Sequence, residues 1–438
     1  MTQQPPGSMG APFVGEAFRF LKDPFAFTLS RTKQHGNVWK TRILGDTVVF
    51  FAGPAAFSFF MNPENFTRQN GSPRFLQELL HSDAVPFLDG ERHRTRKRLL
   101  LSAFSSRALD GYLPGIFAVI ERFATRWASE GEKPVAGDLP QLGFDVADHL
   151  FAASDPGSSN VESAADFTLM NRGAFSPPVN LPFTAYGKAV KARDRLRAYI
   201  KRQVASRDGK GTALGVLKDA RGPGGEKLPA AELEIELLHF FFAAHSGLTA
   251  AIAWLLVVLG EHPDLAAAVR AEADQVLGDA APTIAQIGQL AAARAVSREV
   301  LRAYPIAPVT FFGVALRDLE WGGHAIRAGW KGAGAIWATL QDSSTFSDPT
   351  GFSGDRLGDD AVRALPAGAF VPQGGGPPEG HRCAGEALIQ MVMPAFLGWF
   401  TRRYDLVYPE QDASPGSGGL GPLPKSGIRI AIKRRQPG

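Results

Sequence analysis

One uninterrupted apolar segment, residues 237–260, limits most strongly how this chain can fold. It reads LLHFFFAAHSGLTAAIAWLLVVLG and contains no Asp, Glu, Lys or Arg. As a helix it is long enough to cross a bilayer, but two histidines, Ser246 and Thr249 lie within it and charged amphipathic segments flank it. A helix that is apolar on every side can equally be buried by neighbouring helices. We therefore expect a central helix within a large helical domain, and no membrane span.

The rest of the chain divides by pattern into a β-rich part, a helical core and a second group of short strand-like segments. A hairpin is indicated where two β-patterned segments flank the turn 44–46, within a β-rich region of about 36–70. Helical periodicity dominates a core of about 91–303, interrupted by residues 206–229, which we expect to form an exposed loop. No clean domain linker is evident, so we expect one mainly α domain over residues 1–438 with a small β region.

The charge pattern argues against nucleic acid as a partner. The chain carries 47 Lys and Arg against 43 Asp and Glu, and no interleaved aromatics accompany its densest basic run, residues 92–98. A solvated helix face is the ordinary interpretation of such a run. The single cysteine, Cys383, excludes an internal disulfide, and residues 1–12 lack the apolar segment of a signal peptide. We expect a cytoplasmic monomer.

A glycine-rich loop leads to that cysteine. Residues 370–386 read FVPQGGGPPEGHRCAGE, and an apolar helical pattern starts at Ala387. A thiolate at a helix start meets spare N–H donors and the positive end of the helix dipole, and His381 and Arg382 add positive charge beside it. Such a thiolate suits axial ligation of a haem iron. A lone cysteine is more often a small buried apolar residue, so both interpretations stay open on the cysteine alone.

Two short spacings add candidate partners. Glu299 and Arg302 are three residues apart at the end of a helical stretch, and Arg356 could complete a buried cluster with them. His93 and Lys97 are four residues apart, so they share one face of the basic helix. Their donors and charge match the two propionates of a haem, although an ordinary basic helix has the same spacing.

Taken in order, these segments resemble the cytochrome P450 family. A basic helix with His-x-x-x-Lys, a long apolar helix, Glu-x-x-Arg, Phe-x-x-x-Arg and the cysteine loop follow one another along nearly the whole chain. The resemblance implies a mainly helical prism with a small β-rich region, and haem b as the cofactor. It implies Cys383 as the proximal ligand of the iron, His93, Lys97, His381, Arg382 and Gly376 around the cofactor, and a structural triad of Glu299, Arg302 and Arg356.

Individual segments resemble two different branches of that family. The extra residues after Gly376 in the cysteine loop, Lys97 in the basic helix and the segment 304–308 are similar to the bacterial fatty-acid peroxygenases. The segments 240–251, 178–187 and 313–316 are similar to the branch that hydroxylates retinoids and related terpenoid lipids.

The distal helix departs from both branches. Family monooxygenases carry an acid and a threonine for proton delivery, whereas this chain has Ser246 and Gly247, preceded by His245. Thr249 lies about 200° further round the helix from Gly247, so it should not replace the missing alcohol. The arginine and proline by which peroxygenases hold a carboxylate are absent from 240–251. Proton delivery could come from Ser246 with water or from the substrate, or ordinary oxygen activation could be absent.

The resemblance also implies a substrate pocket lined by several distant segments. The lining is almost wholly apolar, which suits a lipophilic substrate, although apolar runs are more often core than pocket. The candidates are Val85, Phe87, Phe183, Ala243, Ala244, Gly247, Pro308, Val309, Thr310, Phe311 and Leu420.

These features favour a haem-thiolate monooxygenase that acts on a lipophilic molecule of fatty-acid, terpenoid or secondary-metabolite type. It would use O2 and electrons from a separate ferredoxin or flavodoxin, for which Arg94, Arg98 and Arg382 are candidate docking residues. The loop suggests a peroxide-dependent peroxygenase as an alternative, and the missing proton relay suggests an isomerase or dehydratase. A haem-binding sensor would need no substrate chamber.

Overall fold

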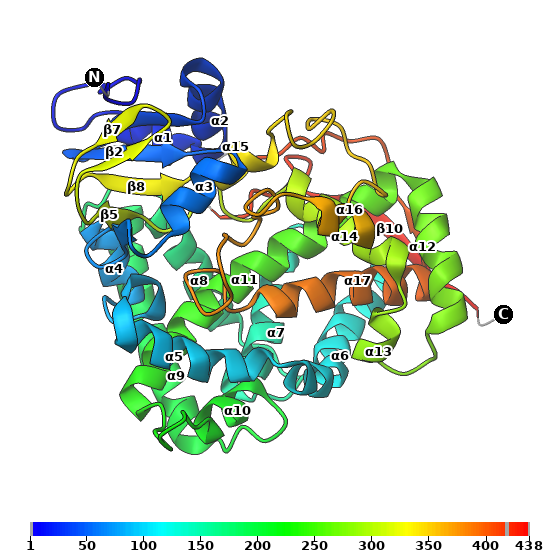
Figure 1. Cartoon of the computed structure of the whole chain (residues 1–438). Helices are drawn as coiled ribbons and strands as arrows, with labels where there is room; N and C mark the ends of the chain where they lie inside the picture. The colour runs from blue at the N-terminus through cyan, green and yellow to red at the C-terminus, as the bar shows by residue number, and fades with distance from the viewer. Residues whose placement is uncertain (1–2, 417–419, 437–438) are drawn as a thin grey trace.

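A helical body makes up most of the molecule, and a small β region lies at one edge of it, beside the N-terminus (Figure 1). The computed structural model describes residues 3–416 and 420–436. The mainly helical architecture with a small β-rich region is the one expected from the sequence.

The long helix α11 (Ala230–Glu261) runs through the middle of the helical body (Figure 1). It packs against α7 (Leu139–Ala152), α8 (Val161–Ala174), α9 (Ala185–Ser206) and α17 (Glu386–Arg403). It is the one helix in the described part of the chain that is apolar and long enough to cross a membrane, and 89% of its most apolar window is buried by the protein. The expectation of a central buried helix is confirmed.

The remaining helices surround this centre. Two short 3-10 turns, η1 (Val85–Phe87) and η2 (Ser102–Phe104), flank α5. The helices are α1 (Ala17–Lys22), α2 (Pro24–His35), α3 (Pro54–Met61), α4 (Arg74–Leu80), α5 (Gly90–Leu101), α6 (Ser106–Glu130), α10 (Ala213–Asp219), α12 (Pro263–Val276), α13 (Ile284–Ile287), α14 (Ala291–Ala303), α15 (Ile336–Leu340) and α16 (Asp359–Ala364).

The expectation of an exposed loop over 206–229 is only partly right, because α10 lies within it. Leu214 and Leu217 are three residues apart and fully buried. That spacing places both on one face of a short helix, which contacts η2 and α7. Burial of these two leucines packs the segment against the helical body, although glycines and charged residues surround them in the sequence.

The main sheet has the strand order β1-β2-β8-β5-β3. Strands β1 (Val38–Ile43) and β2 (Asp46–Phe51) form an antiparallel hairpin, with Val38 opposite Phe51, as the sequence indicated. Leu44 and Gly45 between them both have positive φ, 50° and 91°, which is the backbone of a tight hairpin turn. The other strands are β3 (Phe66–Thr67), β5 (Gly313–Ala315) and β8 (Lys331–Gly334).

One pairing in this sheet matters for the site. Strand β3 pairs antiparallel with β5, with Thr67 opposite Val314. The pairing brings Arg68, which directly follows β3, beside Gly313, although the two are far apart in the sequence. The smaller sheets contain β4 (Lys133–Pro134), β6 (Leu319–Trp321), β7 (His324–Ile326), β9 (Tyr404–Val407) and β10 (Arg429–Arg434).

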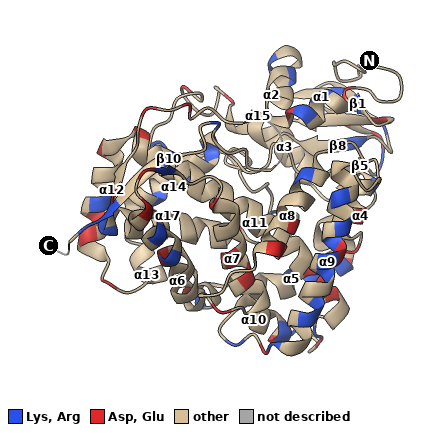
Figure 2. Cartoon of the chain, turned by 180° about the vertical axis from the view of Figure 1, so that it is seen from behind, with Lys and Arg blue, Asp and Glu red and all other residues tan. Residues whose placement is uncertain are grey.

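Charge follows the outside of the helical body. In Figure 2, Lys and Arg lie along the outer helix α9, whereas the central helix α11 carries almost no charge over most of its length. The interior of the molecule is therefore apolar, and buried charges there need a specific partner.

Candidate functional site

The loop before α17 presents Cys383 to the interior of the molecule. Its backbone is fixed by a hydrogen bond from the Cys383 N–H to the Gln373 carbonyl (3.0 Å). Gly374 and Gly376 have φ values of 87° and 82°, a region that side chains other than glycine rarely occupy. The loop thus delivers the cysteine to the start of an apolar helix, as the sequence indicated.

Cys383 is enclosed by protein and yet accessible. Burial raises the pKa of its thiol, while the Lys97 ammonium and the N–H of Gly385 act to lower it. Cys383 nevertheless has a large solvent-accessible surface and counts as exposed. A side chain that is both surrounded and accessible faces an internal space rather than the outer surface. Because the net effect raises the thiol pKa, a thiolate here requires a bound metal ion, which deprotonates a coordinating thiol.

The opposite wall of this internal space is formed by the middle of α11. Ala243 is exposed and Ala244 half-buried, although Phe242 and His245 on either side of them are buried. A side chain at Gly247 would meet only Ile306 Cδ1, at 3.5 Å. Phe104 connects the two walls: it contacts Phe240 with ring centroids 5.4 Å apart, and it lies beside Gly385. The space between the walls is lined by apolar groups.

The basic helix α5 divides its charges between two faces. Arg92, Arg94 and Arg98 are exposed, whereas His93, Arg96 and Lys97 are buried. Residues three and four apart share a helix face, so the inward set follows from the helical period. Burial lowers the pKa of His93 to about 3, and the charges of His381 and Lys97 act in the same direction.

Two inward residues of α5 reach the cysteine loop. The Lys97 ammonium donates to the Arg382 carbonyl, and burial lowers its pKa against the opposing effect of Cys383. The ring of His93 lies on the ring of His381, with centroids 4.2 Å apart. Arg382 itself turns to Glu386. The structure thus brings together His93, Lys97, His381 and Arg382, which the resemblance implied around the cofactor, whereas Gly376 lies beside Met61.

Asp89 organises the polar end of this group. Its carboxylate accepts hydrogen bonds from His381 Nε2 (3.0 Å), the Thr67 hydroxyl (2.5 Å) and the backbone N–H groups that follow β3. Burial acts to raise the pKa of Asp89, but these hydrogen bonds outweigh burial and lower it to about 2. Asp89 therefore stays ionised and fixes His381 relative to the end of β3.

Arg68 adds a buried cation to the same cluster. It is 2% exposed, and its guanidinium lies over the Phe60 ring at 4.2 Å and donates to the sulfur of Met61 (3.5 Å). Burial lowers its pKa to about 10, opposed by Asp89. Its Nη1 is buried and has no hydrogen-bond partner among the described residues. A Cβ at Gly313 would stand 2.5 Å from this Nη1, so the glycine leaves the room that the guanidinium occupies.

These observations fit a haem. A buried guanidinium with an unused donor is unfavourable unless an anion pairs with it, and it lies in the same cluster as His93, His381 and Lys97. A haem offers two carboxylates on one edge of a flat apolar ring. The carboxylates match the polar cluster, the ring matches the apolar internal space, and the sulfur of Cys383 supplies the one soft ligand.

The polar side chains in the middle of α11 do not all point in the same direction. His245 is 4% exposed, stacks on Phe167 of α8 (6.2 Å between centroids) and so points away from the face that carries Ala243. Burial lowers its pKa to about 4. Thr249 donates to the carbonyls of His245 (2.6 Å) and Leu139 (3.2 Å), also away from that face. Ser246 lies at the edge of the face and accepts from Asn171 Nδ2 (2.8 Å).

The expected pocket residues are only partly gathered. Phe87 and Phe311 meet edge to face, with centroids 5.2 Å apart. Val85 is fixed by its N–H, which donates to the buried Glu236 of α11 (2.9 Å). Leu420 lies beside Asn171 (3.4 Å). Phe183 is 74% exposed on the outer surface, so the structure does not bring it to the other residues.

Three further pocket candidates lie between α14 and the sheet. Thr310 exchanges backbone and side-chain hydrogen bonds with Gly334 of β8 (3.0 Å each), which orients it toward the sheet. Pro308 is buried, and Val309 packs against the aromatic core beside the sheet. Thr310 and Val309 thus contact the sheet and the aromatic core beside it.

Glu299, Arg302 and Arg356 form the cluster that the sequence suggested. Arg302 Nε and Nη2 donate to both carboxylate oxygens of Glu299 (2.8 and 2.7 Å), and Arg356 Nε donates to the same carboxylate (3.0 Å). Glu299 and Arg302 have no exposed surface. Arg302 also donates to the Pro349 and Gly351 carbonyls (2.7 and 3.0 Å), so the cluster ties α14 to the segment that leads toward the cysteine loop.

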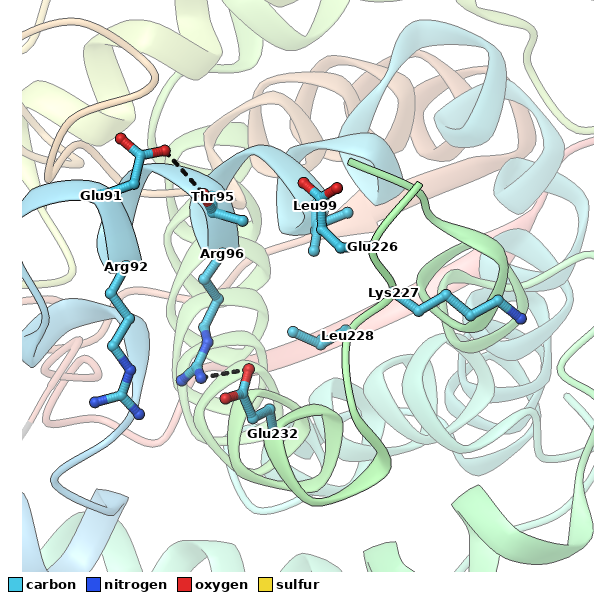
Figure 3. Close-up of a pocket in the computed structure, with 9 residues that line it drawn as sticks. All are labelled: Glu91, Arg92, Thr95, Arg96, Leu99, Glu226, Lys227, Leu228 and Glu232. Atoms are coloured by element: carbon cyan, nitrogen blue, oxygen red, sulfur yellow. Dashed lines mark hydrogen bonds and ion pairs between the residues drawn. The ribbon is translucent and has the colours of Figure 1, made fainter. Parts of the chain in front are cut away.

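A separate hollow of about 270 Å³ lies on the outer side of α5 (Figure 3). Figure 3 shows Arg96 reaching from α5 to Glu232 of α11, a pair 2.5 Å apart, with Lys227 at the far rim. Its lining is mostly charged and open to solvent, unlike the apolar space between Cys383 and α11. It is a surface feature between α5 and the start of α11, and not a chamber for an apolar substrate.

Sequence reasoning missed three polar residues of the site: Arg68, Asp89 and Asn171. Arg68 is followed, after Gln69, by Asn70-Gly71, a pattern typical of a solvated turn. Asp89 has the pattern of a helix N-cap before Gly90, although its side chain caps nothing and bonds to β3 instead. Asn171 occurs within an ordinary amphipathic helix. No local signal distinguishes any of them, because each acquires its role from a distant segment.

Comparison with known proteins identifies relatives over the whole length. A family model described as Cytochrome P450 matches residues 5–154 and 189–426. The cytochrome P450 120 of Synechocystis sp. is 31% identical over 439 residues, covering 98% of this chain and 96% of that protein. Abscisic acid 8'-hydroxylase 1 of Arabidopsis thaliana is 27% identical, covering 98% and 91%. The solved structure of a cyanobacterial CYP120A1 with retinoic acid bound matches with a TM-score of 0.91 and 29% identity, over 99% of this chain and 100% of that one.

Proposed function

The chain belongs to the cytochrome P450 family of haem monooxygenases, and from that premise we propose that it oxygenates a lipophilic molecule of terpenoid type. The reaction would be RH + O2 + 2 electrons + 2 protons → ROH + H2O. Haem b with a thiolate ligand supplies the chemistry that reduces O2 and transfers one oxygen atom to carbon. We assign Cys383 as that ligand, and Arg68, His93, Lys97 and His381 as the residues that hold the propionates.

One observation carries the substrate class: the interior face of α11 is apolar and uncharged where it opens to the chamber. Ala243, Ala244 and Gly247 form that face, and Ser246 at its edge is the only hydroxyl. A chamber of this kind favours a ligand that is apolar over most of its surface. The printed names of two relatives support a terpenoid, since one hydroxylates abscisic acid and another was solved with retinoic acid.

The same face argues against a fatty-acid peroxygenase. An enzyme that anchors a carboxylate beside the haem needs a cation there, and residues 240–251 contain no Lys or Arg. His245, the one titratable residue in that stretch, points toward α8. The extended cysteine loop still favours the peroxygenase as the second candidate, because it resembles the loop of that branch. A haem-thiolate isomerase or dehydratase is a third, since neither an acid nor a threonine stands at 246 and 247.

Electrons for a monooxygenase must come from a partner protein. The exposed charges of α5, Arg92, Arg94 and Arg98, support docking of an acidic ferredoxin or flavodoxin by electrostatic attraction. Arg92 pairs with Asp83 (3.2 Å), Arg94 with Glu91 (2.8 Å) and Arg382 with Glu386, so Arg98, which forms no ion pair among the described residues, is the strongest candidate. We propose that the protein works as a cytoplasmic monomer with such a partner.

The experiment that tests this function compares oxidants. The haem-loaded protein is incubated with a panel of retinoids, cyclic terpenoids and fatty acids in three arms: with ferredoxin, reductase and NADPH, with hydrogen peroxide alone, or with no oxidant. We expect terpenoid products in the reductase arm, and no product from Cys383→Ala in any arm. Fatty-acid products with peroxide alone would establish the peroxygenase. A rearranged or dehydrated product without any oxidant would establish the third candidate.

A further inference from the structure

Asn171 links three elements at the edge of the interior face of α11. Its Nδ2 donates to the Ser246 hydroxyl (2.8 Å), and its Oδ1 accepts from the N–H of Leu420 (3.4 Å) in the C-terminal loop. That loop is held by two more bonds: Trp254 Nε1 of α11 donates to the Pro422 carbonyl (2.9 Å), and the Gly421 N–H donates to the carbonyl of Ile306, in the segment after α14 (2.7 Å). The position of the Asn171 amide is therefore well determined.

These contacts also determine which hydrogen-bonding groups stay free. A backbone N–H can only donate, so the carbonyl oxygen of Asn171 must face Leu420 and its NH2 must face Ser246. Ser246 is then the acceptor in that bond, and its own O–H has no partner among the described residues. Thr249, one turn further, instead returns its hydroxyl to the His245 carbonyl (2.6 Å). The pair Asn171–Ser246 thus presents two unused donors, one O–H and one N–H.

Both donors lie where α8, α11 and the C-terminal loop meet, at the edge of the interior face of α11. Ser246 is about 60° from Ala243 around α11. On α8, Asn171 lies about 40° from the fully buried Phe167 and about 60° from the buried Ala174, so it belongs to the inward face. Asn171 is half-buried although its neighbours on that face are buried. Its side chain is bounded by Ser246 of α11 and Leu420 of the C-terminal loop, which places the amide at the edge of the interior face of α11.

We propose that Asn171 and Ser246 bind an acceptor oxygen of the substrate, and that this oxygen is a neutral carbonyl. This inference rests on the function proposed above and narrows its substrate class to a terpenoid ketone, aldehyde or ester. Two neutral donors suit a carbonyl oxygen, which has two lone pairs. A carboxylate would bring a charge into an apolar chamber without a cation to pair with it. A hydrocarbon would leave both donors buried and unpaired.

The test uses two ligands that differ only in one carbonyl: the sesquiterpene valencene and its ketone nootkatone. Dissociation constants are measured by calorimetry on the haem-loaded protein, for the wild type, Ser246→Ala and Asn171→Leu. The ratio Kd(valencene)/Kd(nootkatone) of the wild type is divided by that of the variant, which cancels the different solubility of the two ligands in water. We expect this double ratio to be about five to ten for each variant, the effect of one neutral hydrogen bond.

Thr168→Val is the matched control. Thr168 lies on the same helix as Asn171, but its hydroxyl donates to the Ala164 carbonyl (3.1 Å) within the helix. Its double ratio should be close to one.

Double ratios close to one for both Ser246→Ala and Asn171→Leu would overturn the carbonyl inference while leaving the oxygenase function intact. Saturation by retinoic acid where neither ligand binds would contradict the neutral carbonyl as well, because the chamber would then accept a carboxylate. Binding of no terpenoid or retinoid at all would contradict the proposed function itself.

Discussion

At the scale of single residues, Arg68 is a buried cation with an unpaired donor that a haem propionate would satisfy. Its Nη1 has no partner within the described residues, and burial already lowers the pKa of its guanidinium to about 10. Burying the guanidinium costs desolvation free energy, and an apolar side chain in its place avoids that cost. The haem-free protein should therefore tolerate the loss of Arg68. The haem-loaded protein should not, because one propionate would lose a charge-assisted donor.

We therefore predict that Arg68→Met releases haem about tenfold faster than the wild type, the effect of one hydrogen bond to a charged group. The rate is measured by transfer of haem to an excess of apomyoglobin. Arg74→Met, which removes an exposed arginine of α4, serves as the control and should match the wild type. An unchanged haem release rate in Arg68→Met, with folding intact, would show that Arg68 does not bind the propionate.

His245 makes stability depend on pH. Burial lowers its pKa from 6.5 to about 4, so the folded state disfavours the proton that the unfolded chain accepts. The contribution of the neutral ring is complete above pH 6.5 and is lost as the pH falls toward about 4. At about pH 5 the expected loss in the free energy of unfolding is about 2 kcal/mol.

We predict that His245→Phe, which preserves the stacking on Phe167, flattens this dependence. The melting temperature should fall less between pH 7 and pH 5 in the variant than in the wild type, as measured by circular dichroism. Parallel curves for the two proteins would mean that His245 is not the titrating group. His93, whose pKa burial lowers to about 3, contributes in the same direction in both proteins and therefore does not affect the comparison.

At the scale of elements, the cluster of Glu299, Arg302 and Arg356 joins α14 to the chain that leads to the cysteine loop. Arg356 donates to Glu299 and to the carbonyls of Asp348 and Gly351 (3.1 and 3.2 Å), so one side chain orders several turns of irregular backbone. Because Glu299 has no exposed surface, its charge cannot be hydrated if an arginine is removed.

We predict that Arg356→Ala lowers the free energy of unfolding by about 3–5 kcal/mol and yields little haem-loaded protein. Urea unfolding and the haem content after purification are the measurements. Arg363→Ala removes an arginine that is paired with Asp360 at the surface of α16, and should change the stability by less than about 1 kcal/mol. Equal stability of both variants would show that the buried cluster does not maintain this part of the fold.

The helix α11 has room for a side chain at position 247, where it has a glycine. A Cβ at Gly247 would make only an ordinary contact with Ile306 Cδ1 at 3.5 Å. Gly247→Thr should therefore fold and add a hydroxyl on the chamber side. We predict a change of at least about twofold in product formed per NADPH consumed, with substrate affinity altered less than the coupling. The same coupling in both proteins, for good and poor substrates, would mean that proton delivery does not depend on this position.

At the scale of the whole molecule, the parts that the sequence predicted are those defined by local spacing. The hairpin 38–51, the buried α11, the cysteine at the start of α17 and the Glu299–Arg302 pair all follow from residues close in the chain. Helix phase could also have separated His245 from Ala243, since two positions rotate a side chain by about 200°. That geometry was available from the sequence and explains why His245 is not in the chamber.

The parts that could not be predicted are made by tertiary pairing. Arg68 is part of the site because β3 pairs with β5 and places it beside Gly313. Asn171 meets Ser246 across the packing of α8 on α11, and Asp89 meets His381 across almost 300 residues. No periodicity encodes these contacts. Their physical signature is visible only in three dimensions, as a buried donor or carboxylate whose partners come from other elements.

The proposed function depends most directly on the origin of the oxygen atom in the product. With ferredoxin, reductase, NADPH and catalase present, turnover of a terpenoid ketone under ¹⁸O2 should give a hydroxylated product that carries one ¹⁸O atom, analysed by mass spectrometry. Catalase removes peroxide released to solution, so it should not reduce the yield. Unlabelled product, or a reaction that catalase abolishes and added hydrogen peroxide restores, would contradict a reductase-driven monooxygenase.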